Sequence, residues 1–182
     1  SGIMKKQAVV KLFILVAYSA LIFILVINHE YWFDEGQAWN IARDNDVAEI
    51  FAMMKYEGHP PLWHLILKVF IYFGCSWRAL GLVSLGIMTL TAGIILFCLP
   101  IKLYLQVALL LSSGMLYTNS VISRVYCVIY LLLAVIALLY PCRKKHPVLF
   151  GLTVALLANT HICMCGMVGI IGIFMLVDFC GD

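Results

Sequence analysis

Charged residues are scarce in this chain. They make up 12% of its 182 residues, whereas 64% of the residues are hydrophobic and the mean hydropathy is +1.05. A soluble domain carries about 25% charged residues, because water must solvate its surface. The composition therefore excludes a soluble globular protein and a disordered chain. It also excludes a basic nucleic-acid binder, since the net charge is only +3 and the Lys and Arg residues are dispersed.

The sequence also lacks a linker and a disulfide framework. No stretch rich in Ser, Gly or Pro marks off a soluble appendage, so we expect one membrane domain over residues 1–182. The seven cysteines are odd in number and mostly lie inside apolar runs, where Cys behaves as a small hydrophobic residue. We therefore predict no disulfide bonds.

Acidic residues are absent between Glu57 and Asp178, and seven of the nine lie between Glu30 and Glu57. Before this cluster, residues 8–27 form a 20-residue stretch whose only charge is Lys11. At about 1.5 Å per residue, this stretch spans the roughly 30 Å hydrocarbon core of a bilayer. We predict the first transmembrane helix over residues 8–27.

Further apolar runs predict more transmembrane helices. They cover residues 79–99, 103–118, 121–140, 148–161 and 163–178. The segment Leu62–Gly74 has only 13 residues, about 20 Å of helix, so we expect it to lie in the outer leaflet instead of crossing. Trp63, Tyr72 and Trp77 then suit the membrane interface, while His64 and Lys68, one helical turn apart, form the water-exposed face of this segment.

Positive charges set the expected orientation. Lysines precede the first span, so the positive-inside rule places the N-terminus in the cytoplasm and the acidic cluster outside. If Leu62–Gly74 does not cross, Lys102 and the run Arg143–Lys145 also lie inside. The fold class is therefore an all-α integral membrane protein of the cell membrane. It has about six transmembrane helices and a large first outer loop, residues 28–78, with short amphipathic juxtamembrane helices.

Two short helices are expected in this outer loop. Asp34 followed by Gln37, and Asp46 followed by Glu49, are typical of capping boxes. The apolar faces that follow are Ala38, Trp39, Ile41 and Ala42, and then Val47, Ile50, Phe51 and Met54. Pro61 can open the next helix, because its missing N–H costs nothing there.

Asp34 and Glu35 place two carboxylates directly after the first membrane helix, next to three aromatic residues. A carboxylate at the membrane surface can act as a general base, since a partly dry setting raises its pKa into a useful range. The alternative is structural: Asp34 caps the next helix and Glu35 complements its dipole. The local sequence does not decide between them.

Arg124 stands near the outer end of two apolar helices, with no acidic residue nearby in sequence. A guanidinium at membrane depth is costly and usually faces a partner, an aqueous cavity or an anionic ligand. A phosphate would match both its charge and its fork of donors. The alternative is an interfacial Arg that extends to lipid headgroups.

His161 follows Asn159 and Thr160 between apolar runs. Three consecutive polar residues indicate a lined cavity, and a short exposed loop is the alternative. With Cys163 and Cys165 the spacing is His-x-Cys-x-Cys, but a closed zinc site normally needs four converging ligands and no second pair is visible.

His59 follows Glu57 and precedes two prolines, so we expect it in a rigid turn near Asp34. There it could orient a substrate, or join Asp34 and Glu35 around a divalent cation. The alternative is a turn histidine at the membrane interface. The sequence leaves metal dependence open and implies no other cofactor.

The order of these motifs resembles the N-terminal membrane module of the GT-C glycosyltransferases. The motifs are Trp32-Phe33-Asp34-Glu35 with Trp39, His59-Pro60-Pro61-Leu62, Ser123-Arg124-Val125-Tyr126 and Asn159-Thr160-His161. The branch that they resemble holds the protein O-mannosyltransferases and the lipid A aminoarabinose transferase. The resemblance spans roughly residues 8–173, whereas the chains of this family are considerably longer.

The resemblance implies an inverting glycosyltransferase that moves a sugar from a polyprenyl-phosphate carrier to a glycan, lipid or protein acceptor outside the membrane. The resemblance implies that Asp34 and Glu35 are catalytic. It implies that Arg124, His161 and Tyr126 bind the donor phosphate. It also implies that Glu57 and His59 orient the substrate. Many members carry another Asp shortly after the Arg, whereas this chain continues with Val125-Tyr126-Cys127-Val128.

Two other functions are open alternatives. The chain could be a non-catalytic membrane protein that binds a polyprenyl phosphate or a partner subunit. It could also be a transporter, given an isolated Arg124 and a polar His161, but no paired intramembrane charges and no inverted repeat stand out.

Overall fold

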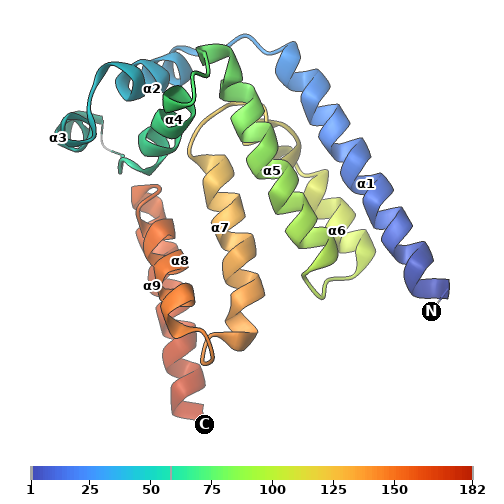
Figure 1. Ribbon diagram of the computed structural model, residues 1–182. Coiled ribbons are helices and arrows are strands. Elements are labelled where there is room, and N and C mark those ends of the chain that lie inside the picture. Colours follow the sequence, from blue (N-terminus) through green and yellow to red (C-terminus); the bar gives the residue numbers. More distant parts are fainter. Residues whose placement is uncertain (1, 58, 182) are drawn as a thin grey trace.

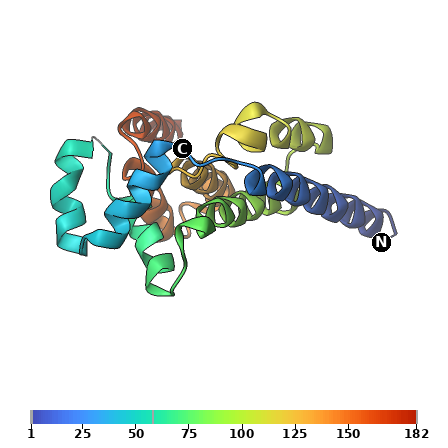
Figure 2. The ribbon, with the colours of Figure 1, turned by 90° about the horizontal axis from the view of Figure 1, so that it is seen from above.

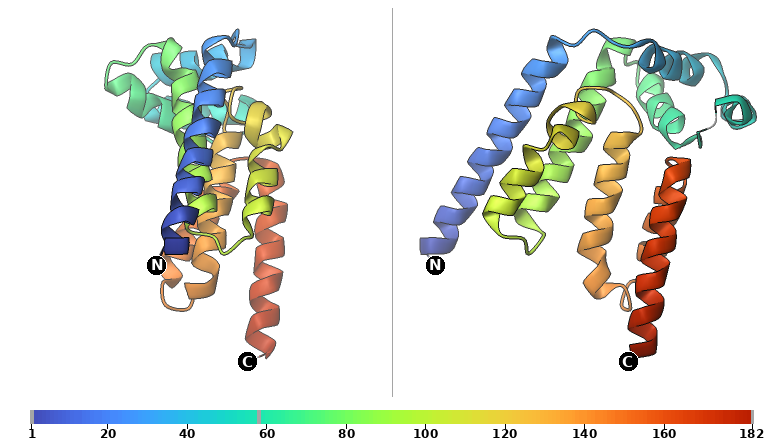
Figure 3. Two further views of the ribbon diagram at one scale, coloured as in Figure 1. Left: turned by 90° about the vertical axis from the view of Figure 1, so that its right-hand side faces the viewer. Right: turned by 180° about the vertical axis from the view of Figure 1, so that it is seen from behind.

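The computed structural model describes residues 2–57 and 59–181, and within them the chain is helical and has no strand. Helices α2 (Phe33–Asp44), α3 (Val47–Glu57) and α4 (Leu62–Tyr72) gather at one end of the molecule. The two termini lie at the opposite end (Figures 1 and 3). Seen from above, α3 lies at the periphery, on the side away from the N-terminus (Figure 2).

Three helices of the described chain are long and apolar enough to cross a membrane. They are Lys5–Ile27 within α1 (Gly2–Ile27), Trp77–Phe97 across the 3₁₀ turn η1 (Trp77–Ala79) and α5 (Leu80–Phe97), and Ile162–Cys180 within α9 (Ile162–Gly181). The chain is therefore an all-α membrane protein, and its expected total of about six crossings stays a prediction.

The remaining helices are shorter. They are α6 (Leu103–Leu110), the π-helical turn η2 (Gly114–Thr118), α7 (Tyr126–Leu139), the 3₁₀ turn η3 (Tyr140–Cys142) and α8 (Pro147–Ala158). The stretch 103–118 is thus not one continuous helix, and α7 begins five residues later than the sequence predicts. At this break the Ser112 hydroxyl donates to the Leu109 carbonyl at 2.7 Å, and a Cβ at Gly114 would lie 2.4 Å from the Tyr130 hydroxyl.

Helix α5 packs between α1 and α7 and forms the centre of the apolar core. Ile22, Leu80, Met88 and Leu96 are fully buried between these helices. At Gly81 a Cβ would lie 2.4 Å from a methyl group of Val26, so only glycine permits this approach of α1 to α5. The outer face of α1 stays apolar and exposed, as expected for contact with lipid.

Two charged contacts connect helix ends. The ammonium group of Lys11, the only charge in residues 8–27, donates to the Leu96 carbonyl near the C-terminus of α5. This contact places a cation where the helix dipole is negative. At the end near the termini, Asp178 of α9 accepts hydrogen bonds from the Arg143 guanidinium and, at 2.7 Å, from the Tyr140 hydroxyl.

The capping predictions had different outcomes. The Asp46–Glu49 box is confirmed, because the Glu49 N–H donates to the Asp46 carboxylate at 2.8 Å and the Asp46 N–H to Glu49 at 2.7 Å. The Asp34 cap is wrong: α2 begins at Phe33, and it is Glu35 that accepts the Trp32 N–H. The apolar face of α2 is buried as expected, whereas α3 buries only Ile50.

Helix α4 packs against α2 and not against water. Trp63 and His64 are 4% and 5% exposed, so the expected interfacial position of Trp63 and the water-exposed face at His64 and Lys68 are wrong. The Lys68 ammonium donates to the carbonyls of Ala42 and Asn45 at 3.1 and 2.6 Å. It thereby caps the C-terminal end of α2.

Cysteine labelling tests whether α5 crosses the membrane. Cys75 lies at the end that carries α2–α4, and Cys98 follows α5 at the opposite end. In single-cysteine variants reconstituted in sealed, uniformly oriented vesicles, we expect a membrane-impermeant maleimide to label one of the two only, and the other only after permeabilisation. Labelling of both from the same side would contradict the crossing.

Candidate functional site

Glu35, in the first turn of α2, has a fully buried side chain. Its Oε1 accepts a hydrogen bond from the backbone N–H of Ser123 at 2.6 Å. Its Oε2 accepts from the backbone N–H of Trp32 at 2.8 Å and lies 3.0 Å from Nε2 of His29. These three partners replace water and make the burial of a carboxylate tolerable. Glu35 therefore fastens the start of α2 to the loop that leads to Arg124.

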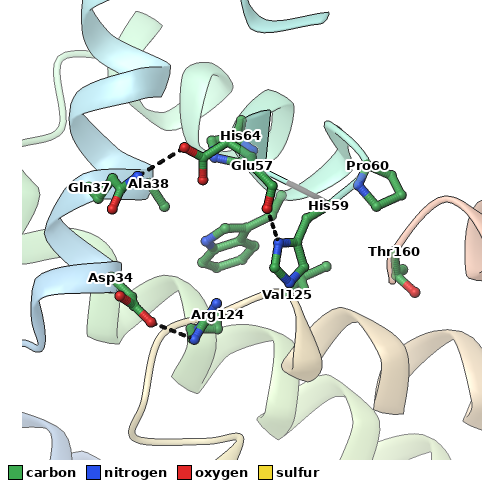
Figure 4. A pocket seen from close by; sticks show the side chains of 11 residues that line it. Asp34, Gln37, Ala38, Glu57, His59, Pro60, His64, Arg124, Val125 and Thr160 are labelled. Atoms are coloured by element: carbon green, nitrogen blue, oxygen red, sulfur yellow. Dashed lines mark hydrogen bonds and ion pairs between the residues drawn. The ribbon is translucent and has the colours of Figure 1, made fainter. Parts of the chain in front are cut away.

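Asp34, one residue earlier, is accessible to water, whereas Glu35 is buried. Its Oδ2 accepts a hydrogen bond from Nη1 of Arg124 at 2.8 Å (Figure 4). The two side chains are 53% and 30% exposed, so water reaches the ion pair. An exposed pair of this kind contributes about 0–1 kcal/mol, so a stronger anionic ligand can displace the Asp34 carboxylate from the guanidinium.

Three rings gather next to Arg124. The His59 and His161 ring centroids are 4.9 Å apart, and those of Tyr126 and His161 are 5.8 Å apart. The Arg124 guanidinium carbon lies 5.8 Å from the centroid of the Tyr126 ring, within the range of a cation–π contact. The turn before α4, the start of α7 and the α8–α9 turn thus meet at one place.

A pocket of about 230 Å³ opens beside these groups (Figure 4). It is lined by Asp34, Gln37, Ala38, Glu57, His59, Pro60, Trp63, His64, Arg124, Val125 and Thr160. Pockets for drug-sized ligands measure about 300–1,000 Å³, so this one suits a small polar headgroup and leaves no room for a lipid chain.

Glu57 connects two sides of the pocket. Its Oε1 accepts from the Gln37 amide at 2.9 Å, and its backbone carbonyl lies 2.8 Å from Nδ1 of His59 (Figure 4). Because a carbonyl oxygen can only accept, Nδ1 of His59 must carry the proton. In the neutral ring, Nε2 of His59 is then an acceptor.

Two histidines at the site have lowered pKa values. Partial burial lowers the pKa of His161, and the neighbouring His59 and the positive charge of Arg124 lower it further. Burial also lowers the pKa of His64, where the Glu57 charge opposes and His59 adds to the effect. Both imidazoles are therefore mainly neutral at pH 7 in the empty protein.

The residues that the sequence singled out converge from distant segments. Asp34, Glu57, His59 and Arg124 line the pocket, and Tyr126 and His161 lie beside it through their ring contacts. Glu35 is the exception, because it is buried behind the loop that carries Arg124 and does not line the pocket. The two members of the acidic pair thus have different surroundings.

Sequence reasoning missed Gln37, Trp63 and His64 as pocket residues. His64 and Lys68 are the polar residues of an otherwise apolar α4, and both face α2. A polar stripe on an apolar helix can face either water or a polar part of the protein. Nothing local in the sequence could have distinguished these two cases.

Metal ligands do not converge in the described chain. Among residues 2–57 and 59–181, no group of three or more His, Cys, Asp or Glu side chains is placed to hold an ion. Cys163 and Cys165 are free and exposed, so the His-x-Cys-x-Cys spacing forms no site with them. The divalent cation considered from the sequence finds no ligand set in these segments.

No family model, no curated protein and no solved structure matches the chain.

The two carboxylates should respond differently to removal of their charge. Glu35→Gln places an amide N–H₂ against backbone donors in a buried setting, so we expect a loss of about 1–3 kcal/mol in the free energy of unfolding. Asp34→Asn removes only an exposed ion pair, and we expect a loss below about 1 kcal/mol. Denaturant unfolding in detergent, followed by Trp fluorescence, measures both. Equal losses would contradict the division of roles.

Proposed function

We propose that this chain is an inverting glycosyltransferase module that moves a sugar from a polyprenyl-phosphate donor to an acceptor at the outer face of the cell membrane. The observation that carries the proposal is the convergence of an exposed carboxylate, Asp34, with the cation of Arg124 on one small pocket, with the His161 ring beside it. The pocket lies at one end of a bundle of apolar helices, where a lipid headgroup can reach it.

In the proposed reaction, the Asp34 carboxylate accepts the proton of an acceptor hydroxyl or amine. The acceptor atom attacks the anomeric carbon from the face opposite the phosphate, and the bond from that carbon to the phosphate oxygen breaks. The polyprenyl phosphate leaves with the bonding electrons, and the configuration at the anomeric carbon inverts. Arg124 stabilises the charge that develops on the leaving oxygen.

The Asp34–Arg124 ion pair of the empty site explains how a phosphate can bind there. Without a ligand, Asp34 neutralises Arg124 at 2.8 Å, so the site carries no isolated cation in a chain that lies in lipid. A phosphodiester offers the guanidinium two oxygens and a bidentate geometry, which a single contact from Asp34 does not. The exchange frees the Asp34 carboxylate to accept a proton from the acceptor.

The His161 ring adds a proton-coupled step. Its lowered pKa keeps it neutral in the empty site, and an incoming phosphate raises that pKa because it neutralises the repulsion from Arg124. Donor binding is then linked to uptake of a proton. The protonated ring, between His59 and Tyr126, becomes a second positive group for the phosphate.

The distribution of basic residues supports an outer location for the pocket. Lys102 lies in the α5–α6 connection and Arg143–Lys145 in the α7–α8 connection, both at the end that holds the termini (Figure 1). The basic N-terminal residue Lys5 begins a candidate span at the same end. Under the positive-inside rule this end is cytoplasmic, and the pocket is then outside.

Asp34→Asn should separate donor binding from transfer. We expect the variant to bind a polyprenyl-phosphate sugar as tightly as the parent or up to about fivefold more tightly, since Arg124 no longer has a competing carboxylate. We expect transfer of labelled sugar to fall about 10²- to 10⁴-fold, because the proposed base is missing. Native mass spectrometry measures binding, and a radiolabel assay measures transfer.

The control for this variant is Asp44→Asn, which removes an exposed carboxylate of the same helix that pairs with Arg43, away from the pocket. This variant should change neither donor binding nor sugar transfer. If Asp34→Asn leaves transfer unchanged, the proposed base is wrong. If the parent binds the donor but transfers no sugar to any acceptor tested, the non-catalytic lipid-binding alternative is favoured.

Donor binding should also depend on pH. A sugar phosphodiester keeps one negative charge between pH 6 and 8, so a change in affinity over this range reports on the protein. Because the proton taken up by His161 favours the bound state, we expect the affinity to rise about three- to tenfold from pH 8 to pH 6. In His161→Gln the rise should be largely lost, while His146→Gln, exposed at the far end, should keep it. The same pH response in both variants would contradict the linkage.

A further inference from the structure

We propose that the wall of the pocket formed by Trp63, His64, Gln37 and Glu57 is a subsite for an uncharged, hydroxyl-bearing sugar ring, separate from the phosphate-binding groups. This inference rests on the proposed function and specifies the class of donor sugar. It assigns a role to Gln37, Trp63 and His64, which the sequence did not select, and places Glu57 beside them.

The first support is a pair of buried polar atoms without partners. Within the described segments 2–57 and 59–181, Nε1 of Trp63 and Nδ1 of His64 have no hydrogen-bond partner, although their side chains are only 4% and 5% exposed. Both residues line the pocket. A buried polar atom is normally paired, because an unmade hydrogen bond costs the full desolvation of the group. Two such atoms in neighbouring residues that line one pocket favour a ligand that supplies the missing partners there.

The chemistry of these atoms specifies the partner. The indole N–H of Trp63 is a donor only and needs an acceptor. The His64 ring is mainly neutral, so Nδ1 is a donor or an acceptor according to its tautomer. A hydroxyl group satisfies both, since it donates one hydrogen bond and accepts two.

Gln37 and Glu57 complete the wall. The Gln37 amide donates to Oε1 of Glu57 at 2.9 Å, which holds both side chains in place across the pocket. The Gln37 carbonyl oxygen and the Glu57 carboxylate keep acceptor capacity for further donors. Hydroxyl groups of a sugar ring can donate to these oxygens while accepting from Trp63.

The charge of this wall differs from that of the phosphate-binding groups. Figure 4 shows the Gln37–Glu57 pair with His64 on one side of the pocket and the Asp34–Arg124 pair on another. A sugar carboxylate placed against Glu57 would meet a like charge with no cation on that wall. This charge disfavours a uronic acid, and the hydrogen-bonding groups of the wall favour a ring that carries hydroxyl groups.

The test measures binding of three detergent-solubilised probes to the full chain by native mass spectrometry. The probes are undecaprenyl phosphate alone, undecaprenyl-phosphate glucose and undecaprenyl-phosphate glucuronic acid. In the parent we expect the glucose-bearing lipid to bind about tenfold more tightly than the glucuronic acid form. In Trp63→Phe and His64→Leu we expect affinity for the glucose form to fall about 5- to 20-fold, with affinity for the bare phosphate lipid unchanged.

Trp39→Phe is the matched control. Trp39 is 3% exposed on α2 but does not line the pocket, so this change costs similar packing without touching the subsite. It should leave all three affinities unchanged. Trp63→Phe should destabilise the fold no more than Trp39→Phe, because the N–H that it removes has no partner in the empty protein. A larger loss in Trp63→Phe would indicate a structural role and overturn the inference.

The remaining outcomes separate the subsite from the proposed function. If the bare phosphate lipid binds and Arg124→Ala abolishes that binding, but Trp63→Phe and His64→Leu bind the glucose form like the parent, the subsite is wrong and the phosphate site stands. Equal binding of the glucose and glucuronic acid forms would overturn the assignment of a neutral sugar. If no probe binds to the parent, the proposed function fails and the subsite fails with it.

Discussion

The carboxylate of Glu35 joins two segments of the chain on which the geometry of the site depends. It is buried at the start of α2 and accepts the N–H of Ser123, whose neighbour is Arg124. Its other oxygen, Oε2, accepts the Trp32 N–H and lies 3.0 Å from Nε2 of His29, which follows α1. A buried carboxylate without hydrogen-bond donors is costly, so all three partners of Glu35 must be in place in the folded protein. This requirement fixes where Arg124 stands relative to Asp34.

The Asp34–Arg124 ion pair follows from that placement, and it compensates the charge of Arg124 in the empty site. A lone guanidinium at the end of a membrane bundle would be unstable without an anion. With a water-accessible carboxylate at 2.8 Å, the cation is compensated only weakly and remains available for exchange. The neighbouring His161, whose pKa is lowered by burial and by repulsion from His59 and Arg124, adds no permanent second charge. The pocket can therefore gain positive charge when an anion enters and lose it when the anion leaves.

The sequence was sufficient where structure depends on local pattern. Hydropathy predicts the first span, and the Asp46–Glu49 box forms because its partners are three residues apart. Prediction failed where a contact between residues far apart in the sequence determines the structure. The division between Asp34 and Glu35 depends on Ser123 and Arg124, about 90 positions away, and the close approach at Gly114 involves Tyr130 in another helix. His64 was expected to face water because its polarity is visible in sequence and its packing against α2 is not.

Pocket size and helix surface together constrain how a lipid-linked donor would sit. A volume of about 230 Å³ accommodates a headgroup, so the polyprenyl chain must stay outside the pocket. No residue of Ile162–Cys180 in α9 is buried, and this helix begins directly after His161. An apolar chain that runs along such a surface toward the α8–α9 turn would bring its phosphate to the His161 ring from the lipid side. The sugar beyond the phosphate would then point toward α2 and α4, where Gln37, Trp63 and His64 line the pocket. In the proposed reaction, membrane anchoring and sugar recognition would thereby be carried by different helices, which meet only at the phosphate.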